Sequence, residues 1–79
     1  MMLDDILKTV QKIIGDQVGR EVQPDETLSD TGLDSLDVVE AMLNLEEAFP
    51  EAHLEDYEPA MTLTVRELAE KIDWRKVGQ

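Results

Sequence analysis

With 79 residues, 42% of them hydrophobic, the chain is long enough for one small domain with a modest core. The net charge of −12 disfavours nucleic acid and anionic membranes as partners, because their phosphates would be repelled. The absence of cysteine excludes disulfides, thiolate metal ligands and a cysteine nucleophile, and no apolar run reaches the roughly 18 to 20 residues of a membrane span. We expect a cytoplasmic protein, monomeric by default.

The first predicted element is an amphipathic helix of about four turns. Apolar residues recur on one of its faces at Leu3, Ile6, Leu7, Val10, Ile13, Ile14 and Val18. We expect the helix to stop at Gly19, because glycine readily adopts the left-handed conformation that ends many helices. Residues 21–33 follow with Pro24 and several turn-forming side chains but no lasting period. They predict a long loop, held to the core by Val22 and Leu28.

A second helix is predicted from its N-cap Asp34, which follows Gly32, through Phe49. Ser35 therefore lies at the mouth of a helix. Two apolar stripes run along this helix on nearly opposite sides. We define the core stripe as Val38, Met42, Leu45 and Phe49, and the docking stripe as Leu36, Val39 and Leu43 with the bordering polar residues Asp37, Glu40, Asn44, Glu46 and Glu47. A small domain can hardly bury both stripes, so the docking stripe predicts a partner surface.

Pro50 ends this helix, because the residue before a proline is pushed away from helical dihedrals. Residues 51–61 predict a loop with one short helical turn around residues 55–60. Leu54 and Met61 are its expected buried anchors.

A last helix is predicted to begin at a capping box, with Thr64 as N-cap and Glu67 reaching back to its amide. Its apolar face consists of Val65, Leu68, Ala69 and Ile72, and Gly78 follows its end. The chain is thus predicted to be a single all-α domain over residues 1–79. We expect a small antiparallel-type four-helix bundle with three main helices and one short one.

The charges are distributed unevenly. All seven basic residues lie outside residues 21–65, which hold thirteen of the nineteen acidic residues. This concentration of negative charge around the Ser35 helix favours basic protein surfaces as partners.

No catalytic or metal-ligating residue is predicted. The single histidine, His53, has no sequence pattern that places it beside Ser35 with an orienting carboxylate, as a catalytic triad requires. Residues 30–34 lack the alternating oxygen ligands and the closing glutamate of a calcium-binding EF-hand loop.

The segment Gly32-Leu33-Asp34-Ser35-Leu36, between an irregular loop and an acidic helix, resembles the phosphopantetheine attachment site of acyl carrier proteins. The resemblance covers essentially the whole chain. It implies a protein that is a substrate of other enzymes rather than a catalyst. Ser35 would receive 4′-phosphopantetheine from coenzyme A through a phosphopantetheinyl transferase, with Asp34 and Leu36 flanking the attachment point.

The same resemblance implies what the arm carries and which proteins it visits. Acyl groups would be held on its thiol as thioesters and presented to acyl or ketoacyl synthases or ligases of fatty acid, polyketide or related lipid biosynthesis. Basic patches on these enzymes would contact the recognition helix through Asp37, Val39, Glu40, Leu43, Glu46 and Glu47.

The cargo stays open. Thr31 stands where many family members have leucine, and Ala41 is smaller than the leucine often found there. Carriers of D-alanine or other amino acids share the layout, so an aminoacyl or D-alanyl carrier is the alternative within the family. The alternative of another class is an acidic helical adaptor that binds a basic partner without a covalent arm.

Overall fold

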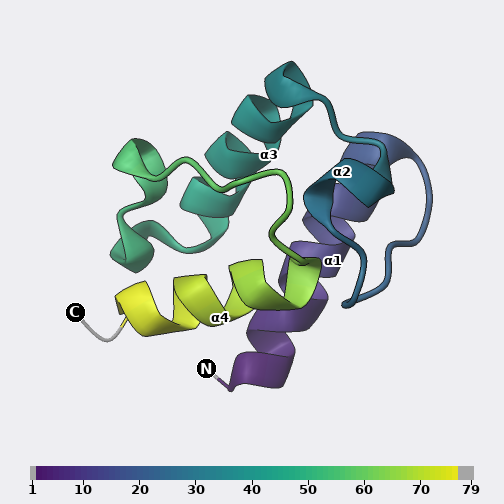
Figure 1. Cartoon of the computed structure of the whole chain (residues 1–79). Helices are drawn as coiled ribbons and strands as arrows, with labels where there is room; N and C mark the ends of the chain where they lie inside the picture. Colours follow the sequence, from purple (N-terminus) through teal and green to yellow (C-terminus); the bar gives the residue numbers. More distant parts are fainter. Residues whose placement is uncertain (1, 77–79) are drawn as a thin grey trace.

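The computed structural model describes residues 2–76, which contain six helical segments and no β-strand. The α-helices are α1 (Leu3–Val18), α2 (Leu28–Thr31), α3 (Ser35–Ala48) and α4 (Val65–Lys76), and two 3-10 helices, η1 (Pro50–Ala52) and η2 (Leu54–Asp56), follow α3. Figure 1 shows the three long helices meeting at one centre, where α1 contacts both α3 and α4. The prediction of an all-α fold with three main helices is confirmed.

The long helix α1 ends where its sequence predicts. Gly19 adopts the left-handed conformation with φ of 80° and donates its N–H to the Gly15 carbonyl oxygen at 2.8 Å. A Cβ atom on Gly15 would lie 2.8 Å from the carbonyl oxygen of Arg20, so the returning chain needs a glycine there as well. These two glycines turn the chain back along α1, and Val22 becomes buried as predicted.

The predicted loop over residues 21–33 is wrong in one part, because it contains the short helix α2. The side-chain oxygen of Thr27 accepts a hydrogen bond from Asp30 N–H at 3.0 Å, which caps the first turn. Gly32, with φ of 100°, ends the helix after its single turn. Tertiary burial of Leu28 and Thr31 then offsets the cost of forming so short a helix.

Backbone pairing fixes α2 against the start of α4. The N–H of Leu28 donates to the carbonyl oxygen of Leu63, and that of Val65 donates to Glu26, both at 2.9 Å. The two chain segments meet in an isolated antiparallel bridge between Thr27 and Thr64. The segment before α3 is therefore held by contacts distant in sequence.

The short helical turn predicted around residues 55–60 is also misplaced. The structure has 3-10 turns at η1 and η2 instead, and residues 57–60 adopt no regular structure. His53 separates the two turns in a left-handed conformation with φ of 52° and ψ of 58°, which interrupts a continuous helix. Of the two predicted anchors, Leu54 is buried, whereas Met61 is only half-buried.

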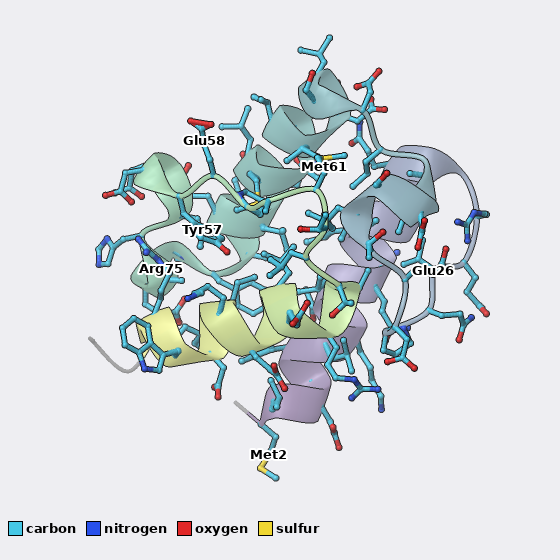
Figure 2. All side chains as sticks on the ribbon, in the orientation of Figure 1. Met2, Glu26, Tyr57, Glu58, Met61 and Arg75 are labelled. Atoms are coloured by element: carbon cyan, nitrogen blue, oxygen red, sulfur yellow. The ribbon has the colours of Figure 1, made fainter. Side chains whose placement is uncertain are left out.

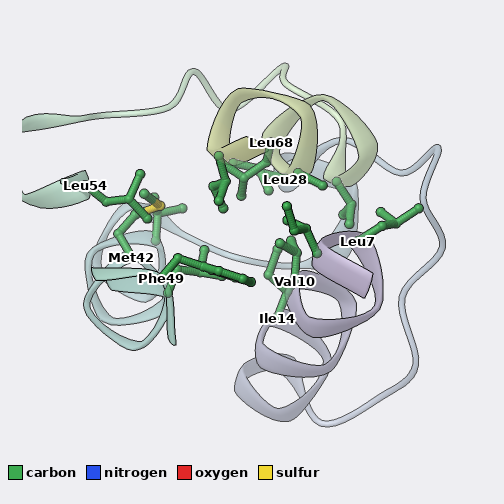
Figure 3. Close-up of a cluster of buried hydrophobic side chains, with 14 of the residues drawn as sticks. Leu7, Val10, Ile14, Leu28, Met42, Phe49, Leu54 and Leu68 are labelled. Carbon is green, nitrogen blue, oxygen red and sulfur yellow. The ribbon is translucent and has the colours of Figure 1, made fainter. Parts of the chain in front are cut away.

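The core lies between α1, α3 and α4. Figure 3 shows Phe49 reaching from the end of α3 toward Val10 and Ile14 of α1, with Leu68 of α4 nearby. All four residues of the predicted core stripe are buried, and so are the four predicted apolar residues of α4. The core faces of the long helices are thus as their periodicity predicts.

The capping box of α4 is formed as predicted. Glu67 N–H donates to Thr64 Oγ1 at 3.0 Å, and Thr64 N–H donates to Glu67 Oε1 at 2.9 Å. Gly78 lies outside the described residues, and no helix within residues 2–76 is long and apolar enough to cross a membrane.

Replacing Thr64 with alanine should lower the free energy of unfolding by about 1 kcal/mol, because the Glu67 amide loses its acceptor. Urea denaturation followed by circular dichroism measures the loss. Thr62→Ala is the matched control, since Thr62 is exposed in the preceding turn and should be nearly neutral. Equal stabilities of the two variants would contradict a capping role for Thr64.

Candidate functional site

Ser35 is the first residue of α3 and is exposed to solvent. The helix is capped by its neighbours rather than by Ser35 itself. Asp37 N–H donates to Asp34 Oδ1 at 2.8 Å, and Asp34 N–H donates to Asp37 Oδ2 at 3.3 Å. This reciprocal pair is a capping box made of two aspartates. Ser35 Oγ has no hydrogen bond to another described residue, so the hydroxyl is available for chemistry.

The electrostatics at Ser35 combine two opposing effects. The N-terminus of α3 carries partial positive charge and amides without intrahelical partners, which favour an attached phosphate. The carboxylates of Asp30, Asp34 and Asp37 lie close to Ser35 in the sequence and oppose it. A phosphate joined to Ser35 therefore depends on another molecule to compensate most of its charge while the bond forms.

The docking stripe is an exposed apolar strip on α3. Leu36, Val39 and Leu43 are 68%, 55% and 57% exposed, in contrast to the buried core stripe of the same helix. Glu40 and Glu47 are exposed as well. Exposure of three large aliphatic side chains on one helix is unusual for a surface without a partner.

Two other predicted partner residues have additional contacts inside the molecule. Asp37 is half-buried, and besides its capping bond it accepts a hydrogen bond from Gln17 Nε2 of α1 at 3.5 Å. Glu46 is half-buried and faces a pocket. The six predicted partner residues thus divide into four exposed ones and two that also shape the domain.

A pocket of about 360 Å³ opens beside Ser35, between α3 and residues 54–61, which we call the outer wall. Its lining consists of Ser35, Val38, Val39, Met42, Leu43 and Glu46 from α3, and of Leu54, Glu55, Tyr57, Glu58, Pro59 and Met61 from the outer wall. Figure 2 shows Tyr57 and Met61 along the segment that runs beside α3. Periodicity alone does not predict this pocket, because the outer wall has no regular repeat.

Three carboxyl groups, those of Glu46, Glu55 and Glu58, lie in the otherwise apolar lining. A hydrogen bond with Glu55 raises the pKa of Glu46. The pKa of Glu55 is lowered, first by a hydrogen bond from its own backbone and then by the one with Glu46. Glu46 is therefore the member of this pair that binds a proton first as the pH falls. Among residues 2–76, no group of three or more acidic or histidine side chains is arranged to hold a metal ion.

The other residues considered from the sequence lie away from this site. His53 is exposed, and its Nδ1 atom lies 3.9 Å from Glu55 Oε1. Trp74 is exposed on α4, with the Lys71 ammonium over its ring at 5.6 Å. Neither residue is among those that line the pocket beside Ser35.

The family model described as the phosphopantetheine attachment site matches residues 4–72, which extend from the first turn of α1 into α4 and include Ser35. No solved structure matches the chain.

Proposed function

Because the chain belongs to the family of proteins with a phosphopantetheine attachment site, whose cofactor is covalently bound 4′-phosphopantetheine, we propose that it is an acyl carrier protein modified on Ser35. The observation that carries the proposal is the free Ser35 hydroxyl, exposed at the N-terminus of α3 and beside a pocket. In this role the chain is a substrate of other enzymes and a carrier, not a catalyst.

The arm would supply the reactive group that the chain lacks. The sequence contains no cysteine, whereas phosphopantetheine ends in a thiol that can hold acyl groups as thioesters. During attachment, Ser35 Oγ would form a new bond to the phosphorus next to pantetheine, the diphosphate bridge of coenzyme A would be cleaved, and adenosine 3′,5′-bisphosphate would leave. The modifying transferase takes up the proton of the hydroxyl. It also compensates the negative charge of the incoming phosphate, which the nearby aspartates repel.

We expect the docking stripe to bring partner enzymes to the arm. These partners are phosphopantetheinyl transferases and acyl or ketoacyl synthases or ligases with basic patches. Val39 and Leu43 supply apolar contact, and Glu40 and Glu47 supply exposed charges. Each exposed ion pair contributes only about 0.2 to 1 kcal/mol and is screened by salt, so binding is weak and readily reversed. A carrier that visits several enzymes needs such binding.

The pocket beside Ser35 would shelter the acyl chain. Its volume of about 360 Å³ lies near the lower end of the about 300 to 1,000 Å³ of ligand pockets. Val38, Met42 and Leu54 offer an apolar lining that favours burial of an aliphatic chain. Fatty acid, polyketide and related lipid pathways all supply acyl groups of this kind.

Mass spectrometry tests the proposed function directly. Incubation of the chain with coenzyme A, magnesium ion and a broad-specificity phosphopantetheinyl transferase should add one arm, located by fragmentation to the peptide that contains Ser35. An unmodified acidic adaptor would gain no mass with any of several transferases. That result would overturn the carrier proposal.

The alternative within the family is an aminoacyl or D-alanyl carrier. The three carboxyl groups around the pocket are compatible with an ammonium group on the cargo. The two cargo classes are separated by loading the modified protein with fatty acyl ligases and with amino acid ligases in parallel. Preferential loading by an amino acid ligase would replace the acyl assignment and leave the Ser35 assignment unchanged.

Replacing Glu40 with lysine should slow acyl transfer by a partner synthase about two- to thirtyfold in kcat/KM, because an attraction becomes a repulsion. The free energy of unfolding should change by no more than about 0.5 kcal/mol, since Glu40 is exposed. Glu70→Lys is the matched control, because Glu70 is an exposed acid on α4, outside the docking stripe. Equal transfer by the two variants would argue against docking through α3.

A further inference from the structure

The outer wall of the pocket has little regular structure of its own to hold it in place. η2, at the start of the wall, spans one turn without a side-chain cap, and η1, which precedes the wall, also spans one turn without such a cap. The left-handed His53 lies between them, and residues 57–60 adopt no regular structure. Leu54 is its one fully buried side chain. Segments with so few internal hydrogen bonds open locally at low cost, so the wall needs an external support.

Arg75 of α4 supplies that support with three hydrogen bonds. Its Nε donates to the Ala52 carbonyl oxygen at 2.9 Å, and its Nη2 donates to the carbonyl oxygen of His53 at 2.6 Å. Nη2 also donates to Asp56 Oδ1 at 3.0 Å. The guanidinium lies over the ring of Tyr57, 5.4 Å from its centroid. One side chain thus holds Ala52 and His53, which lead into the outer wall, together with Asp56 and Tyr57 of the wall itself.

The position of Arg75 makes it suited to this task. It projects from α4 toward the wall, as Figure 2 shows with Tyr57 beside it. Its planar fork of donors matches several acceptors at once, which a lysine ammonium does with less directional precision. The side chain is 25% exposed and does not belong to the buried apolar cluster. Its contacts therefore fix the wall rather than the core.

On the side of the wall that faces α3, no ion pair joins the two segments within residues 2–76. Glu46 of α3 and Glu55 of η2 face each other there, and at neutral pH two such carboxyls repel once both are ionised. Tyr57 and Leu54, which Arg75 holds directly or through the adjoining carbonyls, are lining residues of the pocket. Arg75 therefore holds these lining residues from the α4 side, while η2 packs against α3 on the other side.

We propose that Arg75 is a positioning residue that fixes the outer wall to α4 and so determines how well the pocket retains an acyl group carried on Ser35. The second half of this inference rests on the proposed function. The first half concerns the unmodified chain alone. Loss of Arg75 opens the wall locally, and a carried acyl chain then spends more time in solvent.

Hydrogen exchange on the unmodified full chain tests the first half. The N–H groups of His53 and Tyr57 donate to Pro50 O at 3.2 Å and Leu54 O at 3.0 Å. In Arg75→Ala their exchange should accelerate about tenfold, and Arg75→Lys should recover only part of the protection. The Thr31 N–H of α2 should be unaffected, because α2 can open without breaking any Arg75 contact. Unchanged exchange at His53 and Tyr57 would overturn the proposal.

Arg66→Ala is the matched control for this experiment. Arg66 is also an arginine of α4, and its guanidinium pairs with an exposed carboxylate, that of Asp25, at 3.6 Å. It contacts no residue of the outer wall through a hydrogen bond or ion pair among the described residues. Exchange at residues 53–57 should therefore stay as in the wild type. Equal acceleration in both variants would show a general loosening and count against Arg75 as the specific support.

Thioester cleavage tests the second half. The chain is loaded on Ser35 with an octanoyl or an acetyl arm, and release by hydroxylamine is followed by mass. Arg75→Ala should speed cleavage of the octanoyl thioester about threefold or more, with the acetyl thioester unchanged, because only the longer chain is sheltered. If the ratio of the octanoyl to the acetyl cleavage rate were the same in Arg75→Ala and wild type, both carrying the arm, the retention role would be refuted. Failure of wild type to accept any arm would instead overturn the proposed function, and hydrogen exchange would still decide whether Arg75 fixes the wall.

Discussion

Replacing Ser35 with alanine is expected to abolish attachment of the phosphopantetheine arm while leaving the fold intact. The arm needs the hydroxyl oxygen as nucleophile, so the loss is complete rather than partial. The fold does not need it, because Asp34 and Asp37 cap α3 and Ser35 is exposed. Alanine also has the highest helix propensity, and the free energy of unfolding should stay within about 0.5 kcal/mol of wild type. Intact mass after transferase treatment and urea denaturation provide the two measurements.

The chain provides a matched control for this variant. Ser29 is the only other serine of the sequence, and it is exposed on α2, which precedes Ser35. Ser29→Ala should therefore accept one arm like wild type. If Ser35→Ala still received the arm and Ser29→Ala did not, the attachment site would lie on α2, and the assignment of Ser35 would be wrong.

The helix boundaries could be predicted because they are encoded locally. Asp34 and Thr64 each cap the helix that begins one residue later, and Gly19 ends the helix before it. Each signal acts over three or four residues, within the reach of a single turn. The apolar period then indicated which face of each long helix is buried, and the packing of Phe49 and Ile72 agrees with it.

The missed helix α2 shows where local patterns are insufficient. Thr27, three residues before Asp30, with Gly32 beyond, is a usable capping signal. One turn of helix is unstable by itself, however, and its formation depends on the backbone pairing of Leu28 with Leu63. A contact across so many residues leaves no repeat in the sequence.

The candidate site divides in the same way. Ser35 and the exposed docking stripe follow from a short motif and a helical period. The pocket does not, because its outer wall depends on the hydrogen bonds of Arg75 to the carbonyl oxygens of Ala52 and His53. Main-chain oxygens carry no residue identity, so the sequence gives no sign that they are acceptors. The capping role of Asp37, which is half-buried, is hidden for a similar reason.

Truncation of Phe49 to alanine should produce the largest loss of stability among the substitutions considered. Its ring is 1% exposed, is one of the largest fully buried side chains, and lies between α3 and α1. Loss of such a ring costs about 3 to 5 kcal/mol, because the cavity left behind closes only in part. A domain of this size has a total stability of only about 4 to 12 kcal/mol. The variant should therefore lose a large part of its free energy of unfolding, and its unfolding midpoint should fall to a much lower urea concentration.

Two further substitutions separate cavity formation from other effects at this position. Phe49→Leu keeps most of the volume and should cost clearly less than Phe49→Ala, since cavity size sets the penalty. Leu43→Ala truncates an aliphatic side chain on the exposed face of α3. Its free energy of unfolding should stay within about 0.5 kcal/mol of wild type. Urea denaturation, analysed with one common dependence of the unfolding free energy on urea concentration, gives the free energy of unfolding of all three variants. If Leu43→Ala were as costly as Phe49→Ala, the docking stripe would be a packed surface, and its assignment as the partner-binding face of the carrier would be wrong.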